Sequence, residues 1–285
     1  MSALRFKRVT IIGVGLIGAS LAMALKKAAV VDEIVGAGRT EKNLQRAKEL
    51  GIIDAYSTSY VKAVNSSELV ILASPVGTFR GIVEDIGSRL HKGAIVTDVG
   101  SVKGELVIEM ERLIPEGRFS VGSHPIAGSD RSGLDYADSE LFRGTLTIIT
   151  PTERTNRDAV ETVAALWRAV GASVVLMNPQ EHDRVLALTS HLPHVVSYAL
   201  VNTLSRTNRE YIEYTGGGFR DTTRIASSSP ELWADILLSN KDNVLQMIKI
   251  YKDRLKEIED VLKNKDRYRL MVLFEEAKRL RDSIS

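Results

Sequence analysis

The 285-residue chain contains no cysteine, which excludes disulfide bonds and thiol chemistry. Its 38 basic and 36 acidic residues leave a net charge of only +2, so it lacks the positive charge typical of proteins that bind nucleic acid or anionic membranes. No apolar run approaches the ~20 residues that span a bilayer, and the N-terminus has no signal-peptide pattern. We expect a cytoplasmic protein that binds neither nucleic acid nor membrane.

Short apolar runs alternate with helical patterns through the first part of the chain. The sequence predicts helices at 16–27, 40–50, 79–90, 103–113 and 156–170. It predicts strands at 8–12, 33–37, 68–73, 94–98, 118–122, 146–150 and 172–176. The third of these strands is a continuous apolar run, as is typical of a strand buried in a parallel sheet. The alternation predicts an α/β fold with a doubly wound, mostly parallel sheet.

The pattern changes near residue 178, after which we find no convincing strand. Helical patterns cover 179–205, with Pro193 inside, and then 230–250 and 251–285. The last 45 residues carry 12 basic and 9 acidic side chains among Leu, Ile and Val, which is typical of the solvated face of amphipathic helices. The sequence therefore predicts an α/β domain at 1–178 and an all-helical domain at 179–285.

Three glycines, Gly13, Gly15 and Gly18, form the pattern G-x-G-x-x-G between the first predicted strand and its helix. In this context the pattern is typical of the phosphate-binding turn of a Rossmann domain. Gly13 would make the tight turn, Gly15 would let the backbone approach a pyrophosphate, and Gly18 would let helix and strand pack closely. With Leu16 and Ile17 at the helix N-terminus, these residues form the predicted cofactor-binding loop. The alternative is a glycine-rich turn in another α/β unit.

The end of the second strand bears on the choice of dinucleotide. An NAD enzyme usually has an acidic residue there for the ribose 2′-hydroxyl, but this chain has Arg39 and Thr40, and Glu41 comes later. Arg39 can pair with a 2′-phosphate, so the sequence favours NADP over NAD as cofactor. The alternative is that Arg39 is an exposed residue that stacks on the adenine and discriminates weakly.

Polar residues follow three neighbouring strands at the edge where a doubly wound sheet binds its ligands. These candidate site residues are Ser74, Pro75, Asp98 and Ser101, which we expect to contact the cofactor, and His124. A histidine beside proline and between glycines is a candidate acid or base, because its ordinary pKa lies near neutral pH. Ser101 could hydrogen-bond the same reacting substrate oxygen as His124. The alternative for His124 is a buried, hydrogen-bonded structural histidine.

The helical part carries a second group of polar residues. Ser190 and His194 are four residues apart and would share one helix face. His191 and His194 are three apart, but we predict no metal site, because the chain lacks cysteine and Pro193 distorts this turn.

Two arginines follow the glycines at 216–218. Arg220 and Arg224 are four residues apart and could both bind carboxylates, which arginine does with bidentate geometry. The alternative is two surface arginines bonded to helix ends or to Asp221.

Taken together, these motifs resemble the prephenate/arogenate (cyclohexadienyl) dehydrogenase family of tyrosine biosynthesis. The resemblance extends from Gly13 to about residue 243. Its specificity comes from the order and spacing of the motifs G-V-G-L-I-G-x-S, A-S-P-V, T-D-V-G-S-V-K, S-H-P-I-A-G, T-S-H-L-P-H, G-G-G-F-R-D-T-T-R-I-A and P-E-L-W.

The resemblance implies a Rossmann domain followed by a helical dimerisation domain, with the substrate between them and facing the nicotinamide. It implies a homodimer that catalyses oxidative decarboxylation, in which hydride leaves C4 of a cyclohexadienol for NAD(P) and the ring carboxylate departs as CO2. It leaves prephenate and arogenate both open as the substrate.

The resemblance also implies catalytic roles for His124, Ser101, His194 and Arg224. His124 would polarise the C4 hydroxyl and take its proton, supported by Ser101. Arg224 would hold a substrate carboxylate, and His194 with Ser190 would lie against substrate or nicotinamide. The remaining implied substrate-binding residues are Arg220, at the side-chain end of the substrate, and Asp221 and Trp233, near the dimer interface.

Two alternatives differ in class. Another two-domain NAD(P) enzyme, such as a β-hydroxyacid dehydrogenase or pyrroline-carboxylate reductase, would use a different catalytic set. A catalytically inactive NAD(P)-sensing protein would keep the glycine pattern and lose the second group of polar residues, which this chain retains.

Overall fold

A computed structural model describes residues 4–128 and 133–284 of the chain. Eight strands form one sheet in the order β3-β2-β1-β4-β5-β6-β7-β8. Every neighbouring pair is parallel except β6 and β7, so the prediction of a mostly parallel sheet is confirmed. The strands are β1 (Phe6–Ile12), β2 (Val31–Ala37), β3 (Ala55–Ser57), β4 (Leu69–Leu72), β5 (Ile95–Asp98), β6 (Phe119–Ile126), β7 (Leu146–Thr150) and β8 (Ser173–Leu176).

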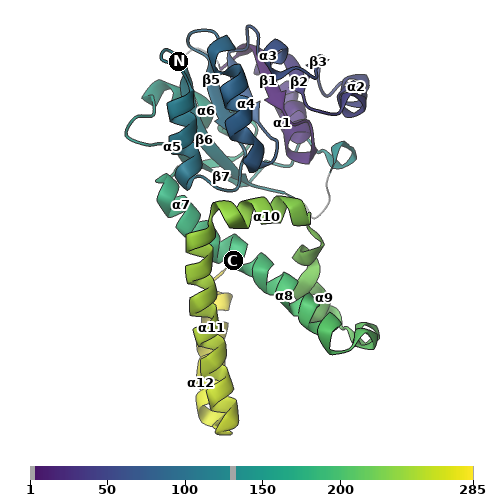
Figure 1. Cartoon of the computed structure of the whole chain (residues 1–285), viewed down its shortest axis with the longest axis vertical. Helices are drawn as coiled ribbons and strands as arrows, with labels where there is room; N and C mark the ends of the chain where they lie inside the picture. The colour runs from purple at the N-terminus through teal and green to yellow at the C-terminus, as the bar shows by residue number, and fades with distance from the viewer. Residues whose placement is uncertain (1–3, 129–132, 285) are drawn as a thin grey trace. The chain divides into compact units, whose positions relative to one another are not determined.

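Helices cover both faces of this sheet (Figure 1). Successive strand residues point to opposite faces, so Ile11 lies in a core with α1, α2 and α6, and Ile12 lies in a core with α3, α4 and α5. Each fully buried aliphatic side chain of this kind contributes about 1.5–3 kcal/mol. The helices are α1 (Leu16–Lys27), α2 (Glu41–Glu49), α3 (Tyr60–Ala63), α4 (Phe79–Ile86), α5 (Gly104–Leu113) and α6 (Arg157–Ala169). The sequence prediction missed β3 and α3, which are short.

The strand that carries His124 is longer than predicted. The sequence predicted its end at residue 122, but β6 continues to Ile126. Its first part pairs with β5, and its second part pairs antiparallel with β7, where His124 lies opposite Ile148. Pro125 fits because β5 has already ended, so this stretch of β6 has a free edge where no backbone donor is needed.

The predicted helix at 179–205 is interrupted. It comprises α7 (Pro179–Leu186), a π-helical turn η4 (Ala187–His191) and α8 (Leu192–Thr207). Pro193 begins α8 without a backbone N–H, and the wider turn precedes it. A short helix α9 (Gly217–Thr223), the turn η6 (Arg224–Ser227) and α10 (Pro230–Ser239) follow.

The predicted helix at 230–250 is wrong in its bounds, because the chain breaks at Asn240. The Asn240 amide donates to the carbonyl of Asp183 at 2.7 Å and to Nδ1 of His191 at 3.1 Å. These bonds hold Asn240 outside helical geometry and tie it to α7 and η4. A long helix α11 (Lys241–Lys263) and a second helix α12 (Arg267–Asp282) replace the predicted break at residue 250.

By its internal contacts the chain forms two compact units, 1–240 and 241–285. The first unit extends beyond the predicted boundary at residue 178 because α7 and α10 pack on the sheet domain. Trp233 and Ile236 of α10 belong to the same buried core as Phe79 of α4. The second unit is the helix pair α11 and α12. Among the described residues, no helix is long and apolar enough to cross a membrane.

Candidate active site

The glycine loop lies at the carboxyl ends of the parallel strands. It follows β1, which pairs with β4 at the point where the strand order reverses. Gly13 has a φ of +103°, and a side chain on it would meet the Ala73 carbonyl group at 2.5 Å. A Cβ on Gly18 would lie 2.1 Å from the Gly13 carbonyl oxygen. Both positions therefore require glycine, one for the turn and one for close packing.

The start of α1 has the geometry of a phosphate site. Gly15 is the N-cap residue, and no side chain caps the first helical turn that contains Leu16 and Ile17. A Cβ built on Gly15 would meet nothing within 4 Å, so the backbone is open to an approaching group. Uncapped N–H groups at the positive end of a 12-residue helix suit the diphosphate of a dinucleotide.

Two further predicted cofactor contacts flank this loop. Arg39 and Thr40 follow β2, and both side chains are exposed on the carboxyl-end side of the sheet. Ser74 and Pro75 follow β4, where the Ser74 hydroxyl pairs with Thr78 Oγ1 at 2.8 Å. All four residues therefore lie at the same edge of the sheet as the glycine loop.

Asp98 was predicted to contact the cofactor, but its carboxylate lies in the interior. It is fully buried and accepts hydrogen bonds from Lys103 Nζ at 2.6 Å and from the backbone N–H groups of Gly100 and Ser123. Lys103 is also fully buried and donates to the Gly100 carbonyl. This ion pair fixes the loop between β5 and α5, which carries the half-buried Ser101.

His124 lies on β6, beside the strand that precedes the Ser101 loop. It is buried, with 8% of its surface exposed. Burial, with the nearby Lys103 charge, holds the pKa of His124 well below its ordinary value. The imidazole is therefore neutral at physiological pH and has an unprotonated nitrogen that can accept a proton.

Sequence reasoning missed two residues of α7, His182, which contacts His124, and Asp183, which contacts His182. Nδ1 of His124 lies 2.9 Å from Nε2 of His182, and Nδ1 of His182 lies 2.8 Å from Oδ1 of Asp183. Asp183 also accepts hydrogen bonds from the backbone N–H groups of Lys103 and Gly104. The only sequence signal was the adjacent His-Asp pair just after the predicted domain boundary.

His191 lies in the same buried region, in η4, and its side chain is fully buried. Burial lowers the pKa of His191 to about 4, against the opposing effect of the Asp183 carboxylate. Its Nδ1 accepts the hydrogen bond from Asn240. His191 is therefore a neutral imidazole that joins η4 to the end of α10.

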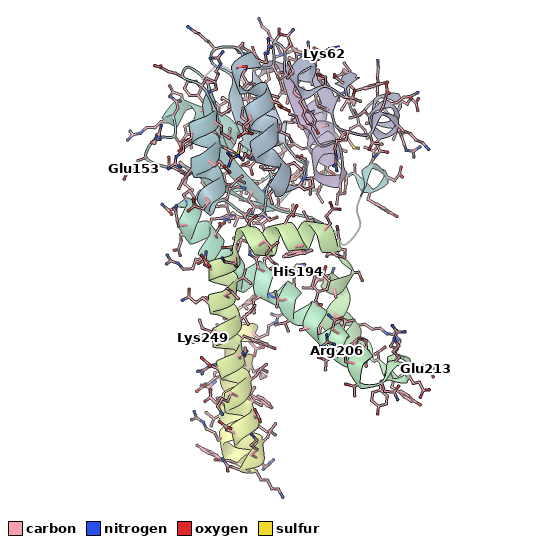
Figure 2. The ribbon with its side chains drawn as sticks, viewed as in Figure 1. Lys62, Glu153, His194, Arg206, Glu213 and Lys249 are labelled. Carbon is pink, nitrogen blue, oxygen red and sulfur yellow. The ribbon has the colours of Figure 1, made fainter. Side chains whose placement is uncertain are left out.

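His194, labelled on α8 in Figure 2, stacks on Trp233 of α10. The ring centroids are 3.4 Å apart and the planes differ by 20°. Nδ1 of His194 donates to the backbone carbonyl of Ser190 at 2.9 Å, so the predicted pair meets through the Ser190 backbone. Burial and the Arg224 charge lower the pKa of His194. Trp233 was expected near the dimer interface, and the structure buries it against His194 of its own chain.

The two arginines lie on adjoining short elements. Arg220 and Asp221 are exposed on α9, and Arg224 begins η6, close enough to His194 to influence it electrostatically. The structure thus stacks His194 on Trp233 and places the Arg224 charge where it acts on His194. It does not bring Arg220 or Asp221 into a described contact with them.

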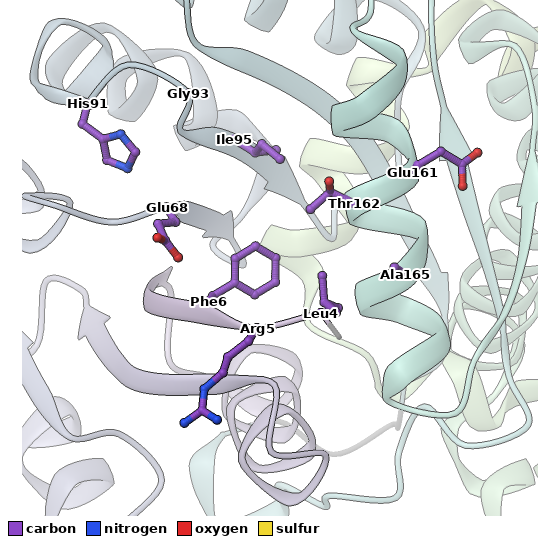
Figure 3. Close-up of a pocket in the computed structure, with 10 residues that line it drawn as sticks. All are labelled: Leu4, Arg5, Phe6, Glu68, His91, Gly93, Ile95, Glu161, Thr162 and Ala165. Carbon is purple, nitrogen blue, oxygen red and sulfur yellow. The ribbon is translucent and has the colours of Figure 1, made fainter. Parts of the chain in front are cut away.

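A surface pocket lies at the opposite, amino-terminal ends of β1, β4 and β5 (Figure 3). Phe6, Glu68, His91 and Ile95 are among its lining residues. Doubly wound sheets bind ligands at the carboxyl ends of their strands, so this pocket is not the candidate active site.

Two family models match consecutive parts of the chain. Residues 21–176 match the nucleotide-binding domain of prephenate dehydrogenase, and residues 178–276 match its dimerization domain. Among characterised relatives, the prephenate dehydrogenase of Bacillus subtilis is 36% identical over 95% of this chain and 74% of its own length. The cyclohexadienyl dehydrogenase of Zymomonas mobilis is 34% identical over 97% of this chain and 95% of its own length.

Solved structures give the same result. Prephenate dehydrogenase from A. aeolicus, in complex with hydroxyphenyl propionate and NAD+, superimposes with a TM-score of 0.94 at 37% identity and full coverage of both chains. Arogenate dehydrogenase from Synechocystis gives a TM-score of 0.83 at 27% identity, covering 98% of this chain and all of its own. A 3-hydroxyisobutyrate dehydrogenase from Mycobacterium tuberculosis, 11% identical over 87% of this chain and 94% of its own, with a TM-score of 0.57, shares the fold alone.

The nucleotide-binding model by itself covers more than half of the chain, and both relatives exceed 30% identity over nearly all of it. The predicted family is therefore confirmed: the chain belongs to the prephenate dehydrogenase family.

Proposed function

We propose that this protein is an NAD(P)-dependent dehydrogenase that oxidatively decarboxylates prephenate, arogenate or both. The observation that carries the proposal is a neutral, buried His124 at the carboxyl-end side of the sheet that bears the glycine loop. An alcohol that loses hydride must also lose its hydroxyl proton, and a histidine held neutral by burial can accept it. The family membership supports the same reaction.

Different residues of this protein carry out different parts of the oxidative decarboxylation. When bound, the nicotinamide supplies the hydride acceptor. His124 accepts the C4 hydroxyl proton as the hydride leaves, and returns it to the oxygen of the phenol as the carboxylate departs and the ring becomes aromatic. Ser101, on the loop fixed by the Asp98–Lys103 pair, supports the same oxygen.

Substrate binding falls to the helical elements. Arg224 binds a substrate carboxylate, while His194, held by Trp233 and the Ser190 carbonyl, lies against the substrate or nicotinamide. Arg220 and Asp221 meet the end of the substrate that distinguishes a keto acid from an amino acid. The cofactor is held by the glycine loop, Ser74 and Pro75, and the exposed Arg39 and Thr40 favour NADP over NAD.

We also propose a functional division at residues 1–178 and 179–285, which agrees with the meeting point of the two family models. The second part contributes both substrate-binding residues and the contacts of a homodimer.

Purified protein mixed with prephenate or arogenate, each with NAD or NADP, tests the proposal by the absorbance of the reduced nicotinamide. We expect reduction in at least one of the four mixtures, with release of CO2. No reduction in any mixture by folded protein that still binds a dinucleotide would contradict the proposed reaction.

A further inference from the structure

Three buried side chains, the candidate base His124 and the two residues behind it, form a continuous hydrogen-bond chain. His124 on β6 meets His182 on α7 at 2.9 Å, and His182 meets the neighbouring Asp183 at 2.8 Å. His182 is fully buried, and Asp183 is 5% exposed. The two imidazoles meet edge to face, with centroids 5.1 Å apart and planes at 63°. Such a row of buried polar groups is costly unless each group is satisfied.

At the Asp183 end of this hydrogen-bond chain, the carboxylate is held in one position. Its Oδ1 accepts from the backbone N–H of Lys103 at 2.7 Å, and its Oδ2 accepts from the N–H of Gly104 at 2.8 Å. A side chain on Gly104 would come within 2.8 Å of Oδ2, so this contact needs glycine. Asp183 thus caps the start of α5, and its carboxylate is an immobile acceptor for His182.

The direction of the hydrogen bond between His182 and Asp183 sets the direction of the bond between His124 and His182. Because a carboxylate only accepts, Nδ1 of His182 carries the proton, and Nε2 of a neutral His182 is then an acceptor. Nδ1 of His124 must therefore donate to it. The remaining nitrogen of His124, Nε2, is left with its lone pair, which is the form that a general base requires.

Among the described residues, few charged groups act on the two histidines of this hydrogen-bond chain. Lys103 faces both histidines and opposes a positive charge on either ring, and His191 faces them from η4. Asp183 and Asp98 have the opposite effect on His182. Asp98 is paired with Lys103, whereas Asp183 bonds directly to the ring of His182. Asp183 is therefore the carboxylate placed to compensate a proton on this chain.

We propose that His182 and Asp183 are positioning residues that hold His124 as its Nδ1–H tautomer and stabilise the imidazolium formed when Nε2 accepts the substrate proton. The proposal rests on the proposed function, because it assigns the orientation of the base in that reaction. It gives α7 a role in the reaction although no residue of α7 needs to touch substrate. Partners that orient the ligand histidines of metal sites typically contribute 10–100-fold to affinity or activity, and we expect an effect of that order here.

The tautomer can be measured without substrate. The chain contains five histidines, so ¹⁵N-histidine labelling gives a spectrum with few signals, and His124→Asn identifies those of His124 by their loss. We expect His124 in the wild-type protein to carry its proton on Nδ1 and to show Nε2 as a nitrogen without a proton. A proton on Nε2 would overturn the proposal.

Two variants separate positioning from packing. In His182→Gln the amide oxygen can replace Nε2 as the acceptor, whereas His182→Leu fills the space without an acceptor. We expect the leucine variant to lose about 10–100-fold in kcat, with KM and dinucleotide affinity nearly unchanged, and the glutamine variant to retain most of kcat. Equal losses in two folded variants, or a leucine variant with wild-type kcat, would contradict the proposal.

The outcomes also separate this proposal from the proposed function. Wild-type protein that turns over neither substrate but shows the Nδ1–H tautomer would contradict the function alone. Protein that turns over a substrate but carries the proton on Nε2 would contradict the positioning role alone. If the leucine variant fails to fold, the wild-type spectrum and the glutamine variant still decide the question.

Discussion

The indole of Trp233 lies flat against the imidazole of His194, with ring centroids 3.4 Å apart. His194 comes from α8 and Trp233 from α10, so the stack joins two helices and fixes the orientation of a candidate substrate-binding histidine. The Nδ1–H of His194 is already donated to Ser190, which leaves Nε2 as an acceptor for a bound molecule.

Replacement of Trp233 should therefore loosen His194. We expect Trp233→Leu to raise KM about 10-fold, while Trp233→Phe, which keeps an aromatic face, should change it about 3-fold or less. Steady-state kinetics with saturating cofactor measure both. Equal KM values for the leucine variant and wild type would show that the stack serves folding only.

His124→Asn tests the base itself. Asparagine can still donate toward His182 but has no nitrogen at the position of Nε2, so we expect kcat to fall by about 100-fold or more. Dinucleotide affinity, measured by fluorescence titration, should stay unchanged. His91, at the other end of the sheet, offers a matched control, since His91→Asn should leave kcat at the wild-type value.

Arg224→Gln tests carboxylate binding and local electrostatics together. We expect KM to rise about 10-fold or more, because a substrate carboxylate loses a charged donor. The Arg224 charge lowers the pKa of His194, so its removal should raise that pKa in an NMR titration. Arg206→Gln at the end of α8 is the control (Figure 2). An unchanged KM would assign Arg224 a structural role.

Arg39→Ala tests the choice of cofactor. The exposed guanidinium can pair with a 2′-phosphate, so we expect NADP binding to weaken about 10-fold or more and NAD binding by about 2-fold or less. Dissociation constants for both dinucleotides, compared with those of the wild-type protein, measure the difference. Equal losses for the two dinucleotides would contradict a 2′-phosphate contact.

The buried histidines should make the fold sensitive to acid. His191 has a pKa of about 4 in the folded protein against 6.5 for an ordinary histidine, and burial also lowers the pKa values of His124 and His182. In this window the unfolded chain binds more protons than the folded one, so stability is lost as pH falls from 6.5 toward 4.

Urea unfolding between pH 8 and pH 4 measures that loss, which should be small above about pH 7. His191→Asn keeps an acceptor for Asn240 but cannot titrate, so its stability should fall less steeply with acid than that of the wild type. His124, His182 and His194, whose pKa values burial also lowers, would contribute to the loss that remains. A variant curve as steep as the wild-type curve would exclude His191 as a contributor.

Local patterns account for most of what the sequence predicted. The glycine loop was predictable because its strand, turn and helix are contiguous in the sequence. The helix at Leu16–Lys27 and the strand at Leu146–Thr150 were predicted with their observed bounds. The antiparallel extension of β6 was not, because it depends on pairing with β7.

The supporting residues of the site were beyond sequence reasoning for the same reason. His124 and His182 are 58 positions apart, and only the packing of α7 against β6 and α5 brings them together. The burial of Asp98 likewise depends on Lys103 folding back beneath its own loop. The hydrogen bonds that hold the break at Asn240 come from partners in α7 and η4 that are 57 and 49 positions away in the sequence.

The cap that Asp183 places on α5 has a consequence for recombination between relatives. The two family models meet between residues 176 and 178, which separates Lys103, Gly104 and His124 from His182 and Asp183. A chimera joined at that point would inherit half of the hydrogen-bond chain from each parent. Such hybrids should be active only when both parents supply matching halves. The boundary between the two family models is therefore a poor place to join domains from different relatives.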